Sequence, residues 1–437
     1  MAHESVTPDP DTARDAHLES AEASAPPTVV TPGRTRLSGR AWVSLREPNF
    51  RYFWLSMLFL MGAIQMQMIA QGYLVYGLTG SPALLGLVNS AFALPMLLLA
   101  LFGGALADRF DRKKIIQIAQ IGFLLTALAV ALTVASGVIT WYHLLAASMV
   151  MGLVFSFIGP ARQAMIPDLV QPENLTNAIA LNSAGMSIMT LLAPAFAGVL
   201  YAVIGPEGVY FVLAGLGLMA VLVTGLLPKS RPVTVDSDAK ILADIGAGIT
   251  YIRHNPMVRI LLGIGLVTAL LAMPFRFLMP VFVVDVYDKG PEAMGLLVSA
   301  MGLGALAGSL FMAQIGRWKR GLLLIGTTFL TGVALLLVAA LPFYMIALVL
   351  MLALGLGDAG RRTLNQALIM EVSDAQYRGR VMSVYMLNFA LMPLGVLPAG
   401  IAAQYFGSQV AVGILAVLLL GITLVILVSQ RELRRFT

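Results

Sequence analysis

The residues of this sequence best suited to chemistry are charged side chains inside otherwise apolar stretches. Asp358 lies in the segment LGLGDAGRRTL, with Arg361 and Arg362 three and four residues after it. On a helix this spacing places all three side chains on one face, where they can form an ion pair. A carboxylate enclosed by apolar residues is also suited to taking up and releasing a proton. Two roles for Asp358 follow from the sequence, proton coupling and a structural ion pair.

A second charge, Arg276, lies in the segment LLAMPFRFLMP, between Pro274 and Pro280. Two prolines so close together predict a bent or broken helix, which is common where a membrane protein lines a cavity. Arg276 would either bind an anionic group of a substrate or extend its long side chain towards the membrane surface.

Neutral polar side chains recur in the same apolar stretches. Inside a membrane such groups form hydrogen bonds between helices or, when several face one space, contacts to a ligand. The chain also has 24 methionines, whose flexible side chains either fill gaps between helices or adapt to varied apolar ligands. The candidate residues of a substrate cavity are Gln67, Gln71, Asn89, Asn182, Ser183, Ser187, Arg276 and Asn388.

The composition identifies the setting of these polar groups as a lipid bilayer. The 437 residues are 59% hydrophobic and only 11% charged, too few charges to cover a water-exposed surface. A membrane-spanning helix needs about 20 mostly apolar residues. Such runs lie near residues 52–77, 83–107, 115–136, 142–163, 176–204, 207–227, 259–284, 293–315, 321–339, 343–364, 380–403 and 408–429. The predicted fold is therefore all-α, with twelve transmembrane helices.

The long polar break in the middle of the chain divides these runs into two sets of six. The predicted organisation is a disordered tail over 1–45, a six-helix bundle over 46–227, a cytoplasmic linker over 228–257, a second six-helix bundle over 258–430 and a cytoplasmic C-terminus over 431–437. Apolar residues at helical spacing predict an amphipathic helix in the linker. Matching residues at corresponding places in the two sets indicate an internal duplication, and parallel halves place a substrate site between them.

The distribution of basic residues predicts the orientation. With both termini in the cytoplasm, all of the 28 Lys and Arg residues except Arg276 and Lys289 lie at cytoplasmic ends or loops. The net charge of +6 therefore reflects membrane topology and does not indicate binding to nucleic acid.

Several classes of site are not indicated. The chain has no cysteine, so it has neither disulfides nor thiolate metal ligands. Its four histidines are scattered without metal-ligand spacing, and it lacks the Gly-x-x-x-x-Gly-Lys-Ser/Thr loop that binds nucleotide phosphates. We expect no enzyme activity, no cofactor and no metal.

The stretch GGALADRFDRKK, residues 103–114, concentrates charge between two apolar runs. It resembles the signature loop of the major facilitator superfamily, Gly-x-x-x-Asp-Arg-x-Gly-Arg-Arg/Lys, except that Asp111 replaces the second glycine of this pattern. The matching positions are Gly104, Asp108, Arg109, Arg112 and Lys113.

The resemblance implies a cytoplasmic latch, which we define as the ion pairing around this loop that holds the two halves together when the cavity opens outward. Asp108 would cap the eleventh helix, and Arg112 would pair with Asp168 at the end of the fourth. The second half has a weaker copy, GRWKRG, in which Lys319 and Arg320 could pair with Glu371.

Two further segments resemble sequences that are associated with a function. LLAPAFAG resembles the antiporter signature Gly-Pro-x-x-Gly-Gly and retains Pro194 and Gly198. PARQAMIPDLVQPENLTNAIALNSAG is similar to the branch that contains the enterobactin exporter and macrolide-efflux permeases. The resemblance implies a monomeric protein of the plasma membrane that exports a bulky, partly apolar small molecule by alternating access, in exchange for protons. The alternatives are an uptake or facilitative permease for a lipid or metabolite, and a non-transporting receptor or scaffold.

Overall fold

The computed structural model describes residues 42–99, 110–228, 249–315, 319–374 and 376–435. Three sets of predictions lie outside these ranges: most of the N-terminal tail, the loop residues Gly104, Asp108 and Arg109, and residues 229–248 of the linker. The described part of the chain contains helices, turns and loops but no strand.

The helices follow the apolar runs. Their bounds are α2 (Pro48–Thr79), α3 (Pro82–Ser90), α5 (Arg112–Ala135), α6 (Trp141–Met165), α7 (Leu175–Gly225), α9 (Pro256–Leu271), α10 (Pro274–Val281), α11 (Pro291–Ile315), α12 (Arg320–Ala340), α13 (Tyr344–Val372), α14 (Arg378–Phe406), α15 (Ser408–Ser429) and α16 (Arg431–Arg435), with short 3-10 or π turns at Val43–Arg46, Ile166–Leu169, Pro172–Asn174 and Phe282–Val286. In the described residues, ten helical segments are long and apolar enough to cross a membrane.

Prolines and capping residues set many of these boundaries. Proline stands at the first position of α2, α3, α9 and α10, where the missing N–H costs no helical hydrogen bond. The Ser81 side chain accepts a hydrogen bond from the backbone N–H of Leu84, and Asn255 accepts one from Val258. The apolar runs therefore begin as helices where the sequence supplies a cap.

Two predicted interruptions are confirmed within the long helices. Gly205, with φ 71°, breaks α7 between the predicted runs 176–204 and 207–227; a side chain would strain this backbone conformation. The seventh run stops at Leu271 and resumes as α10 at Pro274, as the two prolines around Arg276 indicate. The turn predicted at Leu341-Pro342 also separates α12 from α13.

One predicted boundary is wrong. Residues 42–45 were assigned to the disordered tail, but Val43–Arg46 form a 3-10 turn in the fold. Ser44 is fully buried, its N–H donates to the Asn177 side chain, and its hydroxyl donates to the Asn174 carbonyl. These bonds to the start of α7 hold the segment in place, which composition alone could not show.

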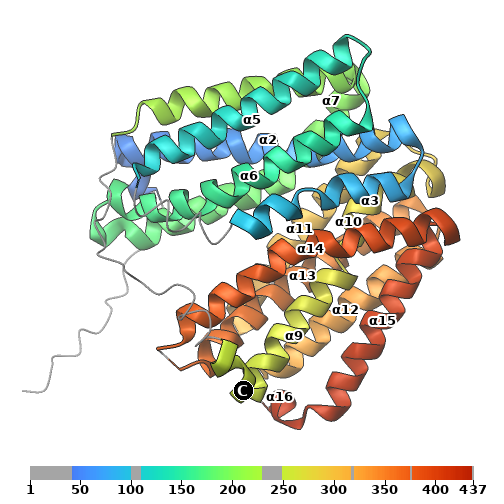
Figure 1. The fold of residues 1–437 in the computed structure, drawn as a ribbon. Coiled ribbons are helices and arrows are strands. Elements are labelled where there is room, and N and C mark those ends of the chain that lie inside the picture. The colour runs from blue at the N-terminus through green and yellow to red at the C-terminus, as the bar shows by residue number, and fades with distance from the viewer. Residues whose placement is uncertain (1–41, 100–109, 229–248, 316–318, 375, 436–437) are drawn as a thin grey trace, which may run out of the picture. The chain divides into compact units, whose positions relative to one another are not determined.

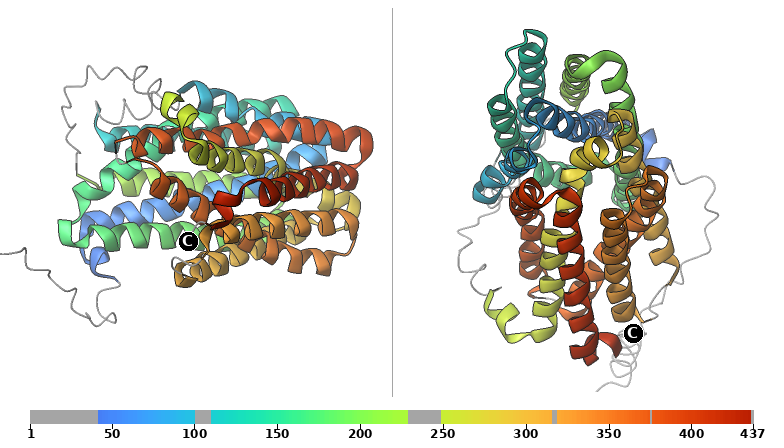
Figure 2. Two further views of the ribbon diagram at one scale, coloured as in Figure 1. Left: turned by 90° about the horizontal axis from the view of Figure 1, so that it is seen from below. Right: turned by 90° about the vertical axis from the view of Figure 1, so that its right-hand side faces the viewer.

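The part of the chain before the linker meets the part after it along two pairs of helices, α3 with α14 and α7 with α11 (Figures 1 and 2). Glycines allow the close approach in both pairs. A Cβ on Gly86 would lie 3.0 Å from the Val396 carbonyl oxygen, and one on Gly295 would collide with the Pro194 carbonyl. We call these two contacts the seam.

Among the described residues, the buried apolar clusters join the two halves at one end. The main cluster contains residues from α2 to α7 and from α10 to α15, so it spans both halves. Two smaller clusters each belong to one half, one around Phe50 and Ile116, the other around Val258 and Leu324. We call the joined end, where α3 begins at Pro82, the seam end, and the opposite end, where α5 and α12 begin with arginine, the basic end.

Candidate functional site

A cavity of about 320 Å³ lies between the two halves. Its lining comes from α2, the segment 82–99, α6, α13, α14 and the broken region around α10. Five predicted residues from separate parts of the sequence meet there. They are Gln67, Gln71, Asn89, Arg276 and Asp358.

The neutral polar side of the cavity is a chain of amides and a hydroxyl. Gln67 Nε2 donates to Gln71 Oε1 at 3.3 Å, and Gln71 Nε2 donates to Ser148 Oγ at 2.7 Å. The first bond joins two turns of α2, because residues four apart face the same way, and the second connects α2 to α6. Asn89 Nδ2 donates to the Leu85 carbonyl of its own helix. These bonds fix amide positions along one wall.

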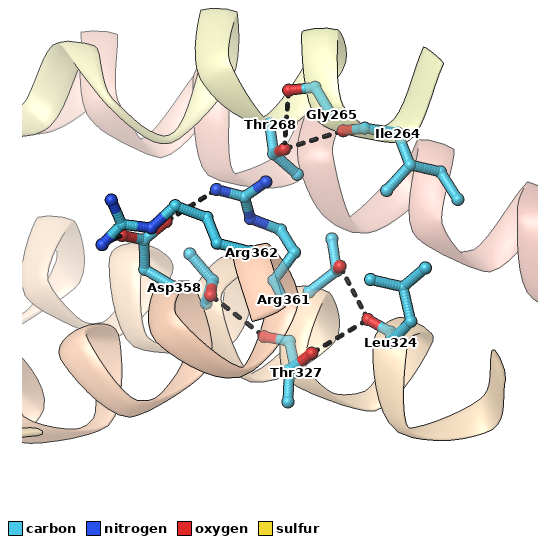
Figure 3. Close-up of polar contacts among 10 residues, drawn as sticks. Ile264, Gly265, Thr268, Leu324, Thr327, Asp358, Arg361 and Arg362 are labelled. Carbon is cyan, nitrogen blue, oxygen red and sulfur yellow. Dashed lines mark hydrogen bonds and ion pairs between the residues drawn. The ribbon is translucent and has the colours of Figure 1, made fainter. Parts of the chain in front are cut away.

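The charged side of the cavity is centred on Asp358 (Figure 3). Its Oδ1 accepts from Arg361 Nη2 at 2.7 Å, and its Oδ2 lies 2.9 Å from Arg362 Nη2. The three side chains differ in exposure: Arg361 is 5% exposed, Asp358 16% and Arg362 42%. Asp358 thus pairs with both arginines, as their spacing predicts, and Arg362 remains open to the cavity.

Arg276 enters the same cavity from the start of α10. Its charge lies within electrostatic range of both Asp358 and Arg362. No partner for its guanidinium is found in the described part of the chain, and its Nε is buried without a hydrogen bond. Of the two roles expected for Arg276, its position in the cavity fits the binding of an anionic group.

The rest of the wall is apolar and flexible. Methionine and phenylalanine side chains dominate it, and these pack against ligands of varied shape. The apolar lining residues are Ile64, Met68, Phe92, Met151, Phe155, Met273, Phe277 and Met392.

A second cavity, of about 440 Å³, lies between α7, α11, α13 and α14. Ser183 and Ser187 line it, and it shares Arg362 with the first cavity. Asn388 lines a small neighbouring space of about 30 Å³ beside Arg361 and Arg362. The polar candidates therefore divide between adjoining spaces that meet at Arg362.

Asn182 lines none of these spaces. Its side-chain nitrogen contacts the sulfur of Met186 at 3.9 Å, one turn further along α7. A residue directly beside Ser183 points elsewhere because successive residues of an α-helix are rotated by about 100°. The grouping of Asn182 with the cavity residues is not supported by this position.

Sequence reasoning missed two of the neutral polar residues that line the first cavity. Gln65 lines the space although it lies off the face shared by Gln67 and Gln71, and Ser148 joins that face from α6. No local pattern marks Ser148, because its role depends on how α6 packs against α2. The glutamine cluster of α2 was the available signal for Gln65.

Two ion pairs among the described residues of the basic end each join residues of one half. Arg112 Nη1 lies 2.8 Å from Asp168 Oδ2, and it also donates to the Ala164 carbonyl at 3.0 Å. In the other half Arg320 Nη1 lies 3.1 Å from Glu371 Oε2. Lys319 stands next to this pair as the N-cap residue of α12. The loop motif predicts the first of these pairs and its second copy predicts the pair of Arg320 with Glu371.

Polar bonds cross between the halves at the seam end. Tyr76 Oη donates to Asp285 Oδ2 at 2.5 Å, and Ser81 Oγ donates to Gln404 Oε1 at 2.8 Å. In the α7–α11 pair, Ser299 Oγ accepts from the Ala195 N–H at 3.1 Å, next to Pro194. A Cβ on Gly198 would collide with the Pro291 carbonyl. Pro194 and Gly198, the antiporter-like pair, thus belong to the seam.

The family model described as Major Facilitator Superfamily matches residues 53–394 of the chain. The chain belongs to the major facilitator superfamily. It is a multi-pass membrane transporter of that superfamily and not an enzyme.

Curated relatives with names of the predicted branch match most of the chain. The staphyloferrin A transporter of Staphylococcus aureus is 27% identical over 80% of this chain and 88% of its own length. Macrolide efflux protein A of Streptococcus pyogenes is 28% identical over 75% of this chain and 83% of its own. The enterobactin exporter EntS of Citrobacter koseri is 27% identical over 89% of this chain and 94% of its own. The predicted resemblance is confirmed.

Among solved structures, a variant of the nucleoside transporter NupG superposes with a TM-score of 0.74. The match covers 87% of this chain and all of that chain, at 13% sequence identity. Identity this low shows a shared fold only.

Proposed function

We propose that this transporter exports bulky, partly apolar small molecules from the cytoplasm by alternating access, in exchange for protons. The observation that carries the proposal is the cavity between the halves, which combines a wall of methionine and phenylalanine with a few fixed polar groups. Such a wall suits ligands of varied shape. Relatives named for macrolide efflux and enterobactin export support the direction of transport.

The architecture proposed for this function has twelve spans in two bundles of six. Ten candidate spans are distinguished by length and apolar content. The segment 172–225 counts as two, because Gly205 divides it. The helix α14 is 29 residues long and contains a shorter apolar stretch, Leu394–Phe406, so it supplies the remaining span. These observations support twelve spans.

We assign the basic end to the cytoplasm because Lys and Arg concentrate there. Both termini are then cytoplasmic, and the seam lies on the outer side. The described state is then closed outside and open inside. In the opposite state the seam would separate, and the signature loop would hold the inner ends together, with Asp108 capping the eleventh helix of the other half. The Arg112–Asp168 pair, which lies within one half, would position this loop.

Asp358 is the group we propose to test for proton coupling, because it is the one carboxylate among the described residues of the central cavity. Its two arginine contacts equally fit a structural ion pair. Protonation would weaken both contacts and leave the arginines without a counter-charge, so a proton at this position would alter the whole charged wall.

The experiment is efflux of a macrolide, of a neutral fluorescent dye and of an anionic fluorescent dye from cells with and without the protein. We expect lower steady-state accumulation with the protein, abolished by an uncoupler. The variant Asp358→Asn should lose uncoupler-sensitive efflux, whereas the matched control Asp374→Asn, at an exposed position, should keep it. Raised accumulation would instead support an uptake permease, and no change with any compound would support a receptor or scaffold.

A further inference from the structure

The charges of the central cavity are unbalanced. Asp358 faces three guanidinium groups, those of Arg276, Arg361 and Arg362. Each of its two oxygens contacts one arginine. The other polar lining groups, of Gln65, Gln67, Gln71, Asn89 and Ser148, are neutral. In the described residues the cavity thus has more positive than negative charge.

Such an excess is costly inside a membrane protein, because charges removed from water need counter-charges nearby. The three arginines differ in how far this need is met. Arg361 is almost fully buried and directly paired. Arg362 is paired but 42% exposed towards the shared space, and the buried Nε of Arg276 has no hydrogen-bond partner. Among the described residues, Arg276 forms no ion pair, and Arg362 shares the single carboxylate of Asp358 with Arg361.

Guanidinium groups bind carboxylates through two parallel N–H bonds. The methionine and phenylalanine side chains next to them offer a surface for an apolar body. A cationic ligand would add to the excess charge, and a neutral ligand would leave it unrelieved.

We propose that the cavity selects amphipathic organic anions, whose acidic group binds between Arg276 and Arg362 while the apolar body lies on the methionine and phenylalanine wall. This inference rests on the proposed export function and narrows its substrate class. The anion takes the place of the counter-charge that Arg276 lacks, and it competes with Asp358 for Arg362. Arg361 stays with Asp358 and holds the carboxylate in place.

The test is direct binding to the purified full-length protein, measured by fluorescence titration with three probes that share one apolar body. The probes are 1-pyrenebutyrate, its neutral amide 1-pyrenebutyramide and the cationic 1-pyrenebutylamine. We expect the carboxylate to bind at least about tenfold more tightly than the amide and the amine least tightly, since one charged contact contributes this much. Equal affinity for carboxylate and amide would overturn the inference.

The variant Arg276→Gln should remove the preference for the carboxylate and change affinity for the amide less than about twofold. Arg276→Lys should retain part of the preference, because it retains the charge. Arg259→Gln, which changes an exposed arginine on α9, is the matched control and should bind all probes as the unchanged protein does. If the folded Arg276→Gln protein kept the full preference, the anion site would lie elsewhere and the assignment would be wrong.

Measurements of binding and of transport test this inference and the proposed function separately. Efflux of macrolide and neutral dye with no carboxylate preference in binding would refute the anion site alone. A clear preference in binding, without movement of any probe in cells, would refute the exporter and leave the anion site standing.

Discussion

At the scale of single residues, the adjacent arginines of α13 have different surroundings and therefore different roles. Arg361 is 5% exposed and bonded to Asp358, whereas Arg362 is 42% exposed and lines both larger cavities. Removing one partner of a buried pair leaves an uncompensated charge, which costs more than the same change at an exposed position. Arg361 therefore serves mainly the fold, and Arg362 mainly the cavity.

We predict that Arg361→Gln lowers the unfolding free energy by about 3 kcal/mol or more, because it leaves Asp358 short of a buried partner. Arg362→Gln should cost about 1 kcal/mol, as expected for a partly exposed pair. Thermal unfolding of both purified variants in the same detergent checks this order. Equal losses of stability would contradict the division of roles.

At the scale of elements, the seam joins the halves through backbone approach at small residues. Gly295 packs on Pro194 and Gly198, and Gly400 on Pro82 and Gly86. Small residues allow helices in membranes to approach closely, where van der Waals contact stabilises their association. A larger side chain in the seam must therefore separate the two helices and favour the state in which this end is open.

We predict that Gly295→Val makes the cavity accessible from the seam end. The chain lacks cysteine, so Asn89→Cys supplies a single reactive thiol in the cavity. Labelling of this thiol in intact cells by a membrane-impermeant maleimide should become at least about tenfold faster with Gly295→Val.

Gly326→Val is the matched control, because a Cβ on Gly326 meets no atom within 4 Å. Labelling of the control at the rate of the parent is expected. An equally slow rate for Gly295→Val would show that this glycine does not hold the seam.

The elements themselves were largely predictable from the sequence. The lengths of the apolar runs predict the helices and the break between residues 204 and 207, and two prolines predict the break before Pro274, because these signals are local. The faces of the helices were not predictable in the same way. Asn182 and Ser183 are neighbours of the same polar kind, yet only Ser183 lines a cavity, because the rotation of α7 depends on its packing against α2 and α11.

For the site, the sequence identified which residues are charged, but it did not show that positive charges outnumber negative charges in the cavity. The spacing of Asp358, Arg361 and Arg362 predicts their ion pairs, since all three lie within one turn of a helix. The position of Arg276 in the same cavity depends on contacts between helices far apart in the chain, and no local pattern encodes it.

At the scale of the whole molecule, the two ends differ in how the halves are joined. At the seam end the main apolar cluster is continuous across both halves, whereas at the basic end each half has its own cluster and its own ion pair. Halves that are joined at one end and separate at the other can rock about the site between them. The assignment of the basic end to the cytoplasm gives this motion a direction.

We predict that single cysteines at the two ends of α5 label from opposite sides of the membrane. Lys114→Cys should react with an impermeant maleimide only after the cells are opened, and Ser136→Cys should react in intact cells. Both positions are exposed, and they lie at opposite ends of a 24-residue helix that spans the bilayer. Labelling of Lys114→Cys in intact cells would show that the orientation is the opposite of the one assigned here. It would also contradict the proposed direction of transport.

Because of the excess positive charge around Asp358, the membrane potential of an energised cell also favours one of the two conformations of the unloaded protein. A membrane potential that is negative inside attracts this charge towards the cytoplasm, by about 2.3 kcal/mol for each full elementary charge moved through 100 mV. With the proposed assignment of the basic end to the cytoplasm, we expect voltage to favour the conformation of the unoccupied protein that opens to the cytoplasm. A bound anion that neutralises the arginines should remove much of this preference. The proposed export cycle would then use the electric field to return the empty transporter to its cytoplasm-facing conformation.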